Sequence, residues 1–271
     1  MVDRELALRV SSAAMLGSVA LALTYAGGWP FTLFTILVSV IVCWEWGRLV
    51  RGAQFDGWLV LHVFSIMSAA FALVLNQAMI AWLILGAVGA LILVGRGLSG
   101  DRLSALGVFY VGLPVLSLIW LRSDEVVGFL AVLFVFVIVW TSDSAAYLFG
   151  RAIGGPRLYP LVSPNKTWAG FLGGILASMI AGVAFGLFLG GTSPLCLGVI
   201  AVSLSLAAQF GDLTESALKR NFGFKDSSGL IPGHGGLLDR VDGLVLAAIV
   251  AAVIGGVVDP IRPGHGLLIW T

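Results

Sequence analysis

Long apolar segments recur along the whole chain, and they limit the structure it can adopt more than any other feature. A helix needs about 20 apolar residues to cross a hydrocarbon core about 30 Å thick, and it satisfies its own backbone hydrogen bonds there. We identify nine such segments, at about 8–26, 30–47, 57–75, 78–95, 103–121, 126–149, 168–190, 194–212 and 241–258. The sequence therefore predicts an all-α integral membrane protein with about nine transmembrane helices, forming a single polytopic domain over residues 1–271.

The composition agrees with a membrane location. Charged residues make up 11% of the chain, whereas soluble proteins carry about 25%. The net charge is +1 and the sequence has no basic run, so we expect no nucleic-acid partner. The two cysteines, Cys43 and Cys196, lie inside apolar segments and offer neither a disulfide framework nor zinc-site spacing.

The positions of lysine and arginine predict the direction of the chain, because cytoplasmic loops of membrane proteins are enriched in both. With the N-terminus in the cytoplasm, the outer side keeps Arg122 and Arg262, and the C-terminus lies outside. The chain has 15 lysines and arginines, and the cytoplasmic side then holds all the others: Arg4, Arg9, Arg48, Arg51, Arg96, Arg102, Arg151, Arg157, Lys166, Lys219, Arg220, Lys225 and Arg240. Two long connections, about 150–167 and 213–240, also fall on this side. We therefore expect a multi-pass protein of the inner (plasma) membrane with its active site facing the cytoplasm.

Four aspartates are predicted to reach one membrane level. Asp143 lies about seventeen residues from the outer end of the sixth segment, which places it roughly 26 Å from that end and near the cytoplasmic boundary. Asp212 ends the eighth segment, and Asp239 and Asp242 open the ninth on one helix face. Carboxylates at one depth repel each other unless a cation lies among them, and Mg²⁺ prefers such oxygen ligands. Alternatively, Asp239 and Asp242 stabilise a helix N-terminus and Asp143 pairs with an arginine.

Basic residues accompany these carboxylates. Lys219, Arg220 and Lys225 follow Asp212, and Lys166 lies in the other long connection. Cations beside a divalent metal suit a polyphosphate, although each one alone could equally anchor the chain to lipid headgroups. The sequence thus favours a site for a phosphorylated substrate.

Glycines and His234 are further candidates for the site, whereas Glu45 is not. Glycines at 223, 229, 233, 235 and 236 allow positive φ and let backbone N–H groups approach an anion. His234 could bind phosphate or carry a proton, and a structural hydrogen bond is an equal alternative. For Glu45 we expect a pair with Arg48 or an interfacial position.

The segment SALKRNFGFKDSSGLIPGHGGLLDRVD, residues 216–242, resembles the signature of the phosphatidate cytidylyltransferases, or CDP-diacylglycerol synthases. SPNKT at 163–167 is similar to the S-P-x-K-T element of that family. The resemblance implies a homodimer in the lipid membrane that catalyses a step of phospholipid biosynthesis. In that reaction CTP and phosphatidic acid give CDP-diacylglycerol and pyrophosphate, with Mg²⁺ as cofactor and a monovalent cation as a candidate second ion.

For this reaction we expect particular residues to have particular roles. The residues expected to be catalytic are Asp212, Asp239, Lys219, Arg220 and Lys225. The expected metal ligands are Asp212, Asp239, Asp143 and Asp242. The expected substrate-binding residues are Lys166, Ser163, Asp226, His234, Gly235 and Arg240.

Two other functions are consistent with part of the pattern. A CTP-dependent lipid kinase would transfer the γ-phosphoryl group and release CDP, and a transporter would use the charged loop as a gate or anion site. The spacing of PGHGG and DRVD favours the cytidylyltransferase over the kinase. The placement of the carboxylates at one face, away from the membrane midplane, disfavours the transporter.

Overall fold

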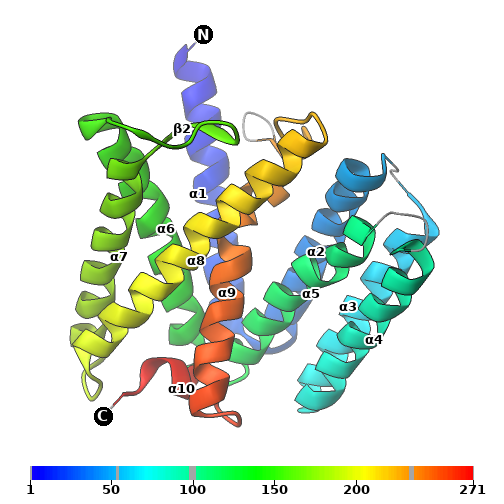
Figure 1. The fold of residues 1–271 in the computed structure, drawn as a ribbon. Coiled ribbons are helices and arrows are strands. Elements are labelled where there is room, and N and C mark those ends of the chain that lie inside the picture. The colour runs from blue at the N-terminus through cyan, green and yellow to red at the C-terminus, as the bar shows by residue number, and fades with distance from the viewer. Residues whose placement is uncertain (1, 53–54, 98–101, 232–234, 271) are drawn as a thin grey trace. The chain divides into compact units, whose positions relative to one another are not determined.

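Helices dominate the computed structural model, which describes residues 2–52, 55–97, 102–231 and 235–270 (Figure 1). The helices are α1 (Val2–Ala26), α2 (Gly28–Arg51), α3 (Gly57–Val74), α4 (Ala78–Gly97), α5 (Arg102–Arg122), α6 (Gly128–Ile153), α7 (Trp168–Leu189), α8 (Pro194–Asn221), α9 (Leu238–Val258) and α10 (Pro263–Leu268). Two short strands, β1 (Arg157–Tyr159) and β2 (Ser163–Thr167), lie between α6 and α7.

The helices from α2 to α9 match the predicted membrane spans. In the described part of the chain, eight helices are long and apolar enough to cross a membrane. The remaining predicted span corresponds to α1, which contributes a shorter apolar stretch, Ala14–Ala26. The prediction of an all-α integral membrane protein is therefore confirmed, while the side on which each terminus lies stays a prediction.

The chain divides into two compact units. The first unit comprises Met1–Ser123 and Phe222–Val241, and the second comprises Asp124–Asn221 and Asp242–Thr271. Helix α9 thus begins in the first unit and continues in the second.

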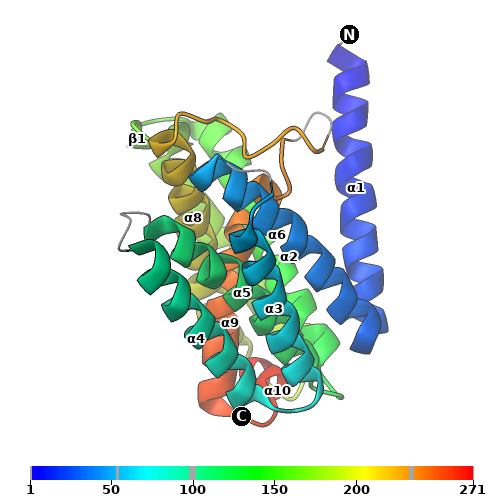
Figure 2. The same cartoon turned by 90° about the vertical axis from the view of Figure 1, so that its right-hand side faces the viewer.

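The first unit packs α2, α3, α4 and α5 around an apolar core (Figure 2). Cys43, Ile66, Leu85 and Leu116 are almost completely inaccessible to solvent and come from these four helices in turn. Leu238, which begins α9, belongs to the same core. The start of α9 is therefore fixed by burial in the core as well as by hydrogen bonds.

The second unit is built around a stripe of small residues on α7. Buried Gly170, Gly174, Ser178, Gly182 and Gly186 recur every fourth residue and so share one face of the helix. A methyl group at position 170 would lie 2.6 Å from the Ala146 carbonyl oxygen of α6, and one at position 182 equally close to the Leu197 carbonyl oxygen of α8. The small residues thus let α6 and α8 approach α7 closely, as small residues do in membrane helix pairs.

A β-hairpin occupies the connection that the sequence left without regular structure. Gly154 and Gly155 have positive φ values of 67° and 93° and end α6. Strands β1 and β2 then pair antiparallel, with Arg157 opposite Thr167. The Thr167 hydroxyl accepts a hydrogen bond from Gly170 N at 3.1 Å and caps α7. The hairpin leads directly into α7 (Figure 1).

Helix α8 continues beyond the predicted end of its apolar segment at residue 212 and runs to Asn221. Asp212, Lys219 and Arg220 therefore lie on a helix. The connection predicted at about 213–240 begins only after Asn221. An ion pair between Glu215 and Lys219, four residues apart, spans this extension. Such pairs stabilise helices by about 0.2–0.5 kcal/mol, so this one supports the extension.

Candidate functional site

The second unit brings together four of the predicted site residues, which we name the acidic cluster: Asp143, Lys166, Asp212 and Asp242. The Lys166 ammonium lies 2.5 Å from Asp212 Oδ2, and the Ser216 hydroxyl donates to Asp212 Oδ1 at 3.4 Å. Asp242 interacts electrostatically with both other carboxylates and with Lys166. Residues from α6, β2, α8 and α9 thus meet in one charged cluster.

Close packing of α8 against α9 places two of the aspartates. A methyl group at position 211 would lie 2.5 Å from the Asp242 carbonyl oxygen and 3.5 Å from the Gly243 Cα. The two backbones can therefore meet only because position 211 is glycine. Asp212 and Asp242 directly follow and precede this contact, so the crossing itself sets how near the two carboxylates come.

A buried polar network fixes α6 against α8 beside Asp143. The hydroxyls of Ser142 and Ser205 are 2.8 Å apart, and Gln209 donates to Ser205 at 3.3 Å and to the Phe171 carbonyl oxygen at 3.3 Å. These polar side chains satisfy one another in a segment that lipid would otherwise surround. The network holds the helix carrying Asp143 in register with the helix carrying Asp212.

The chemistry of the acidic cluster suits a hard divalent cation, because carboxylate oxygens are the ligands that Mg²⁺ prefers. Across the described residues, however, no group of three or more His, Cys, Asp or Glu side chains is close enough to hold a metal ion. The Lys166 ammonium supplies the positive charge nearest to Asp212. The predicted metal ligands therefore fit by donor type, and binding a cation would require the cluster to tighten.

The other basic residues of α8 differ in exposure. Lys219 is buried and lies 2.6 Å from the fully buried Glu215, whereas Arg220 is exposed. Arg220 Nε lies 3.5 Å from the Val162 carbonyl oxygen, next to half-buried Ser163 of the hairpin. Ser163, Lys166 and Arg220 thus occupy one region where β2 meets α8.

The first unit contains the signature segment, which we define as residues 225–238 with 232–234 outside the described residues. His234, a predicted substrate-binding residue, is therefore outside them too. Lys225 and Asp226 before the turn, and Arg240 after it, are exposed. A β-bridge joins Ile231 to Gly235, with Ile231 N donating to the Gly235 carbonyl oxygen at 2.8 Å.

Asp239 braces the signature segment. Its Oδ2 accepts hydrogen bonds from Ser227 N at 2.9 Å, from the Ser227 hydroxyl at 3.0 Å and from Gly236 N at 2.8 Å. Oδ1 receives the longer bond from Ser227 N, at 3.2 Å. The side chain predicted to bind a metal is therefore also a structural acceptor, and its role as a ligand stays a prediction.

Glycine is required at positions 235 and 236 for two different structural reasons. Gly235 has a φ of 81°, which disfavours any residue with a side chain. A methyl group on Gly236 would collide with the Ser227 hydroxyl and with Glu45 Oε1. These constraints come from the fold of the segment, and they need no bound phosphate to explain them.

Glu45 is the residue whose place the sequence did not reveal. Its side chain is completely buried in α2 and contacts the signature segment instead of forming the expected pair with Arg48. A carboxylate in the middle of an apolar span was the available signal, because an acidic residue inside a membrane segment has a partner or a function.

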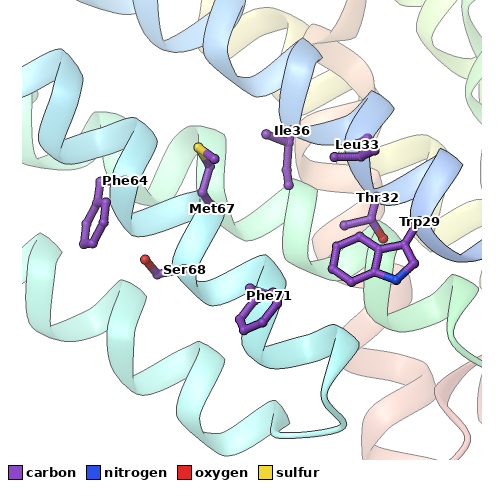
Figure 3. Close-up of a pocket in the computed structure, with 8 residues that line it drawn as sticks. All are labelled: Trp29, Thr32, Leu33, Ile36, Phe64, Met67, Ser68 and Phe71. Carbon is purple, nitrogen blue, oxygen red and sulfur yellow. The ribbon is translucent and has the colours of Figure 1, made fainter.

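A lipid-facing groove of about 320 Å³ lies between α2 and α3 of the first unit (Figure 3). Its walls are mostly apolar, with Trp29 and Phe71 at one end (Figure 3). Thr32 in this groove is about 20 Å along α2 from Glu45, at 1.5 Å per residue. The groove has no charged lining residue and is not a site for a nucleotide.

Comparison with known proteins identifies the family. The model of the cytidylyltransferase family matches residues 7–258. The chain belongs to this family. The matched residues include both the acidic cluster and the signature segment. The resemblance of these local motifs is therefore part of a match that extends over most of the chain.

Cytidylyltransferase-family relatives cover most of this chain. A phosphatidate cytidylyltransferase of Brucella suis is 42% identical over 261 residues, covering 93% of this chain and 94% of that protein. One of Brucella abortus is equally similar over the same length. One of Staphylococcus saprophyticus is 44% identical over 138 residues, covering 51% of this chain and 52% of that protein. The resemblance seen in the signature segment is thereby confirmed.

Proposed function

We propose that this cytidylyltransferase transfers the cytidylyl group of CTP to phosphatidic acid, giving CDP-diacylglycerol and pyrophosphate for phospholipid biosynthesis. The observation that carries the proposal is the 42% identity, over 93% of the chain, to proteins named phosphatidate cytidylyltransferase. The site geometry supports it, because carboxylates on membrane-spanning helices meet a lysine of the hairpin.

The reaction needs little proton transfer. A phosphate oxygen of phosphatidic acid attacks the α-phosphorus of CTP in line, and the bond from that phosphorus to the bridging oxygen of the β-phosphate breaks. Pyrophosphate leaves with the bonding electrons. A phosphate monoester is largely ionised near neutral pH, so the nucleophile already carries its charge. The protein therefore acts by positioning the two phosphates and by stabilising charge.

Basic residues of each unit have the exposure that phosphate binding requires. In the second unit, Lys166 and Arg220 lie where the hairpin meets α8. In the first unit, Lys225 is exposed on the signature segment. Their ammonium and guanidinium groups would accept the negative charge of CTP, of the lipid headgroup and of the departing pyrophosphate.

Asp212 and Asp242, with Asp143, are the residues we expect to hold Mg²⁺ in the second unit, and Asp239 is the expected ligand in the first. When bound, the cation would neutralise phosphate charge and polarise the reacting phosphorus. The release of Asp212 by Lys166 would free a carboxylate for the cation and an ammonium for a phosphate oxygen. A second, monovalent ion belongs to the same proposal.

The cellular setting is likewise proposed. The distribution of lysine and arginine supports an inner-membrane protein whose active site faces the cytoplasm, where CTP is available. Membrane lipid would surround the apolar helices and deliver phosphatidic acid. A homodimer follows from the family resemblance.

The reaction is tested with two preparations of CTP, one labelled at the α-phosphate and one at the γ-phosphate. Purified protein in detergent receives phosphatidic acid, Mg²⁺ and CTP carrying ³²P at the α or the γ position. Transfer of the α label to lipid, with release of pyrophosphate, is expected. Transfer of the γ label would instead identify a lipid kinase, and no turnover of CTP would contradict both enzyme readings. Asp212→Asn serves as the inactive control.

A further inference from the structure

Glu45 of α2 accepts hydrogen bonds from both ends of the signature segment. Its Oε1 accepts from the Ser228 hydroxyl at 2.5 Å and from Leu237 N at 2.9 Å, and its Oε2 accepts from Leu238 N at 2.6 Å. The side chain is completely buried. One carboxylate therefore joins residues that stand on opposite sides of the turn.

A buried carboxylate is retained in a protein interior only when its oxygens are well satisfied. Here two of the donors are backbone N–H groups at the beginning of α9, which lack partners inside their own helix. The positive end of the helix dipole favours the same carboxylate. Glu45 thus caps α9 from a different helix, and its burial depends on the segment being in place.

Asp239 and Glu45 together close the base of the turn. Asp239 binds Ser227 and Gly236, whereas Glu45 binds the next residue on each side, Ser228 and Leu237. The absence of a side chain on Gly236 leaves room for Glu45 Oε1 and the Ser227 hydroxyl. Two consecutive pairs of residues, Ser227 with Gly236 and Ser228 with Leu237, are therefore held together by two carboxylates.

We infer that Glu45 is a positioning residue for cytidylyl transfer, acting through the signature segment without contacting the substrate. It holds the segment so that exposed Lys225 and Asp226 on one side, and Arg240 on the other, keep a set separation for the substrate phosphates. This inference rests on the proposed function, because the segment has a substrate to position only if the protein uses CTP.

A purely structural carboxylate in the same unit offers a matched comparison. Asp56 caps α3 by accepting from Leu59 N at 2.7 Å, and it pairs with Arg51 Nε at 2.7 Å. Like Glu45, it serves the N-terminus of a helix, but its described bonds do not include the signature segment. Loss of Asp56 should therefore reduce stability and leave substrate use intact.

The experiment compares Glu45→Gln with Asp56→Asn in detergent-purified full-length protein. A glutamine amide nitrogen cannot accept hydrogen bonds, so at least one of the three donors loses its partner. For each variant we measure thermal stability, hydrogen exchange of the backbone amides of 227, 228 and 236–238, and kcat and KM for CTP. Wild-type turnover, measured alongside, tests the proposed function separately.

Glu45→Gln should speed exchange at these amides and lower kcat/KM for CTP roughly 10- to 100-fold, the range seen when a supporting partner of a site residue is removed. Asp56→Asn should keep kcat/KM within about twofold of the wild-type value, even if its melting temperature falls as much as that of Glu45→Gln. Normal kcat/KM in folded Glu45→Gln, or an equal loss in Asp56→Asn, would overturn the inference. Unchanged exchange at the five amides would also overturn it, whether or not the enzyme turns over CTP.

Ser228→Ala keeps the inference testable if Glu45→Gln does not fold. It removes a single donor to Glu45 and leaves both backbone bonds to that carboxylate, although Leu230 N also loses the hydroxyl that accepts its hydrogen bond at 3.1 Å. A fall in kcat/KM for CTP, without a matching fall in melting temperature, is expected for a positioning role. In the double variant, where Glu45→Gln does fold, the loss in kcat/KM should be smaller than the sum of the two single losses, because the two residues share a contact. A fully additive loss would contradict this.

Discussion

The Lys166 ammonium lies 2.5 Å from the Asp212 carboxylate, and this pair joins the β-hairpin to the middle of α8. Both side chains are less than one-third exposed. The pair links two segments that lie far apart in the sequence and that were independently expected to contact substrate. It also places an ammonium group among the carboxylates of the acidic cluster, and such a group can form charge-assisted hydrogen bonds to a phosphate.

Lys166→Met should lower kcat/KM for CTP by roughly 10-fold or more, because one charge-assisted contact to phosphate is lost. Stability should change by about 1 kcal/mol or less, since partly exposed ion pairs contribute little. Steady-state kinetics and thermal melting measure the two effects. Arg151→Met is the control: this exposed cation of the same unit bonds to Tyr147. An equal kinetic loss in both variants would indicate a general charge effect.

Asp212→Asn should lower kcat by roughly 100-fold or more, as expected when a group that stabilises transition-state charge is removed. It should also abolish the response to added Mg²⁺ if the carboxylate binds the cation. A Mg²⁺ titration of turnover, from metal-free enzyme prepared with a chelator, measures both. Asp259→Asn, at a half-buried carboxylate of the same unit that pairs with Arg262, should keep wild-type turnover and Mg²⁺ response. Near-normal turnover by Asp212→Asn would remove this residue from the catalytic set.

The membrane fold could be predicted from the sequence because hydropathy reports directly on contact with lipid. Segments long enough to cross a bilayer were found where the helices lie, from Gly28 in α2 to Val258 in α9. The acidic cluster was also foreseeable in part. Asp143, Asp212 and Asp242 are charges in apolar surroundings, and such charges tend to gather around a function.

Three features of the structure were beyond that reasoning. The strands of the hairpin 157–167 are too short to carry a strand pattern, and the hairpin packs against α7 and α8. The last turns of α8 carry the pair of Glu215 with Lys219, which hydropathy does not weigh. Glu45 meets Ser228 and Leu238, which are 183 and 193 residues away in the sequence. One sequence taken by itself gives no signal for such distant pairs.

Gly211→Ala should damage activity by moving the two helices that carry Asp212 and Asp242. The added methyl group would lie 2.5 Å from a backbone oxygen that cannot rotate away. Overpacking of this kind costs about 1–3 kcal/mol of stability. Thermal melting and turnover should both fall. Gly86→Ala in α4, where a methyl group meets nothing within 4 Å, should leave both unchanged. Full activity of Gly211→Ala would show that the crossing does not control the cluster.

Gly236→Ala should open the base of the signature turn, because the new methyl group would take the space of the Ser227 hydroxyl and Glu45 Oε1. The bonds from Ser228 and Leu237 to Glu45 would lengthen together, so kcat/KM for CTP should fall as it does in Glu45→Gln. Gly229→Ala lies in the same segment with nothing within 4 Å of its methyl group, and it should be tolerated. Hydrogen exchange at the amides of 237 and 238 separates the two outcomes. If Gly229→Ala and Gly236→Ala lose activity equally, the defect comes from stiffening the chain, and the fit around Glu45 is not its cause.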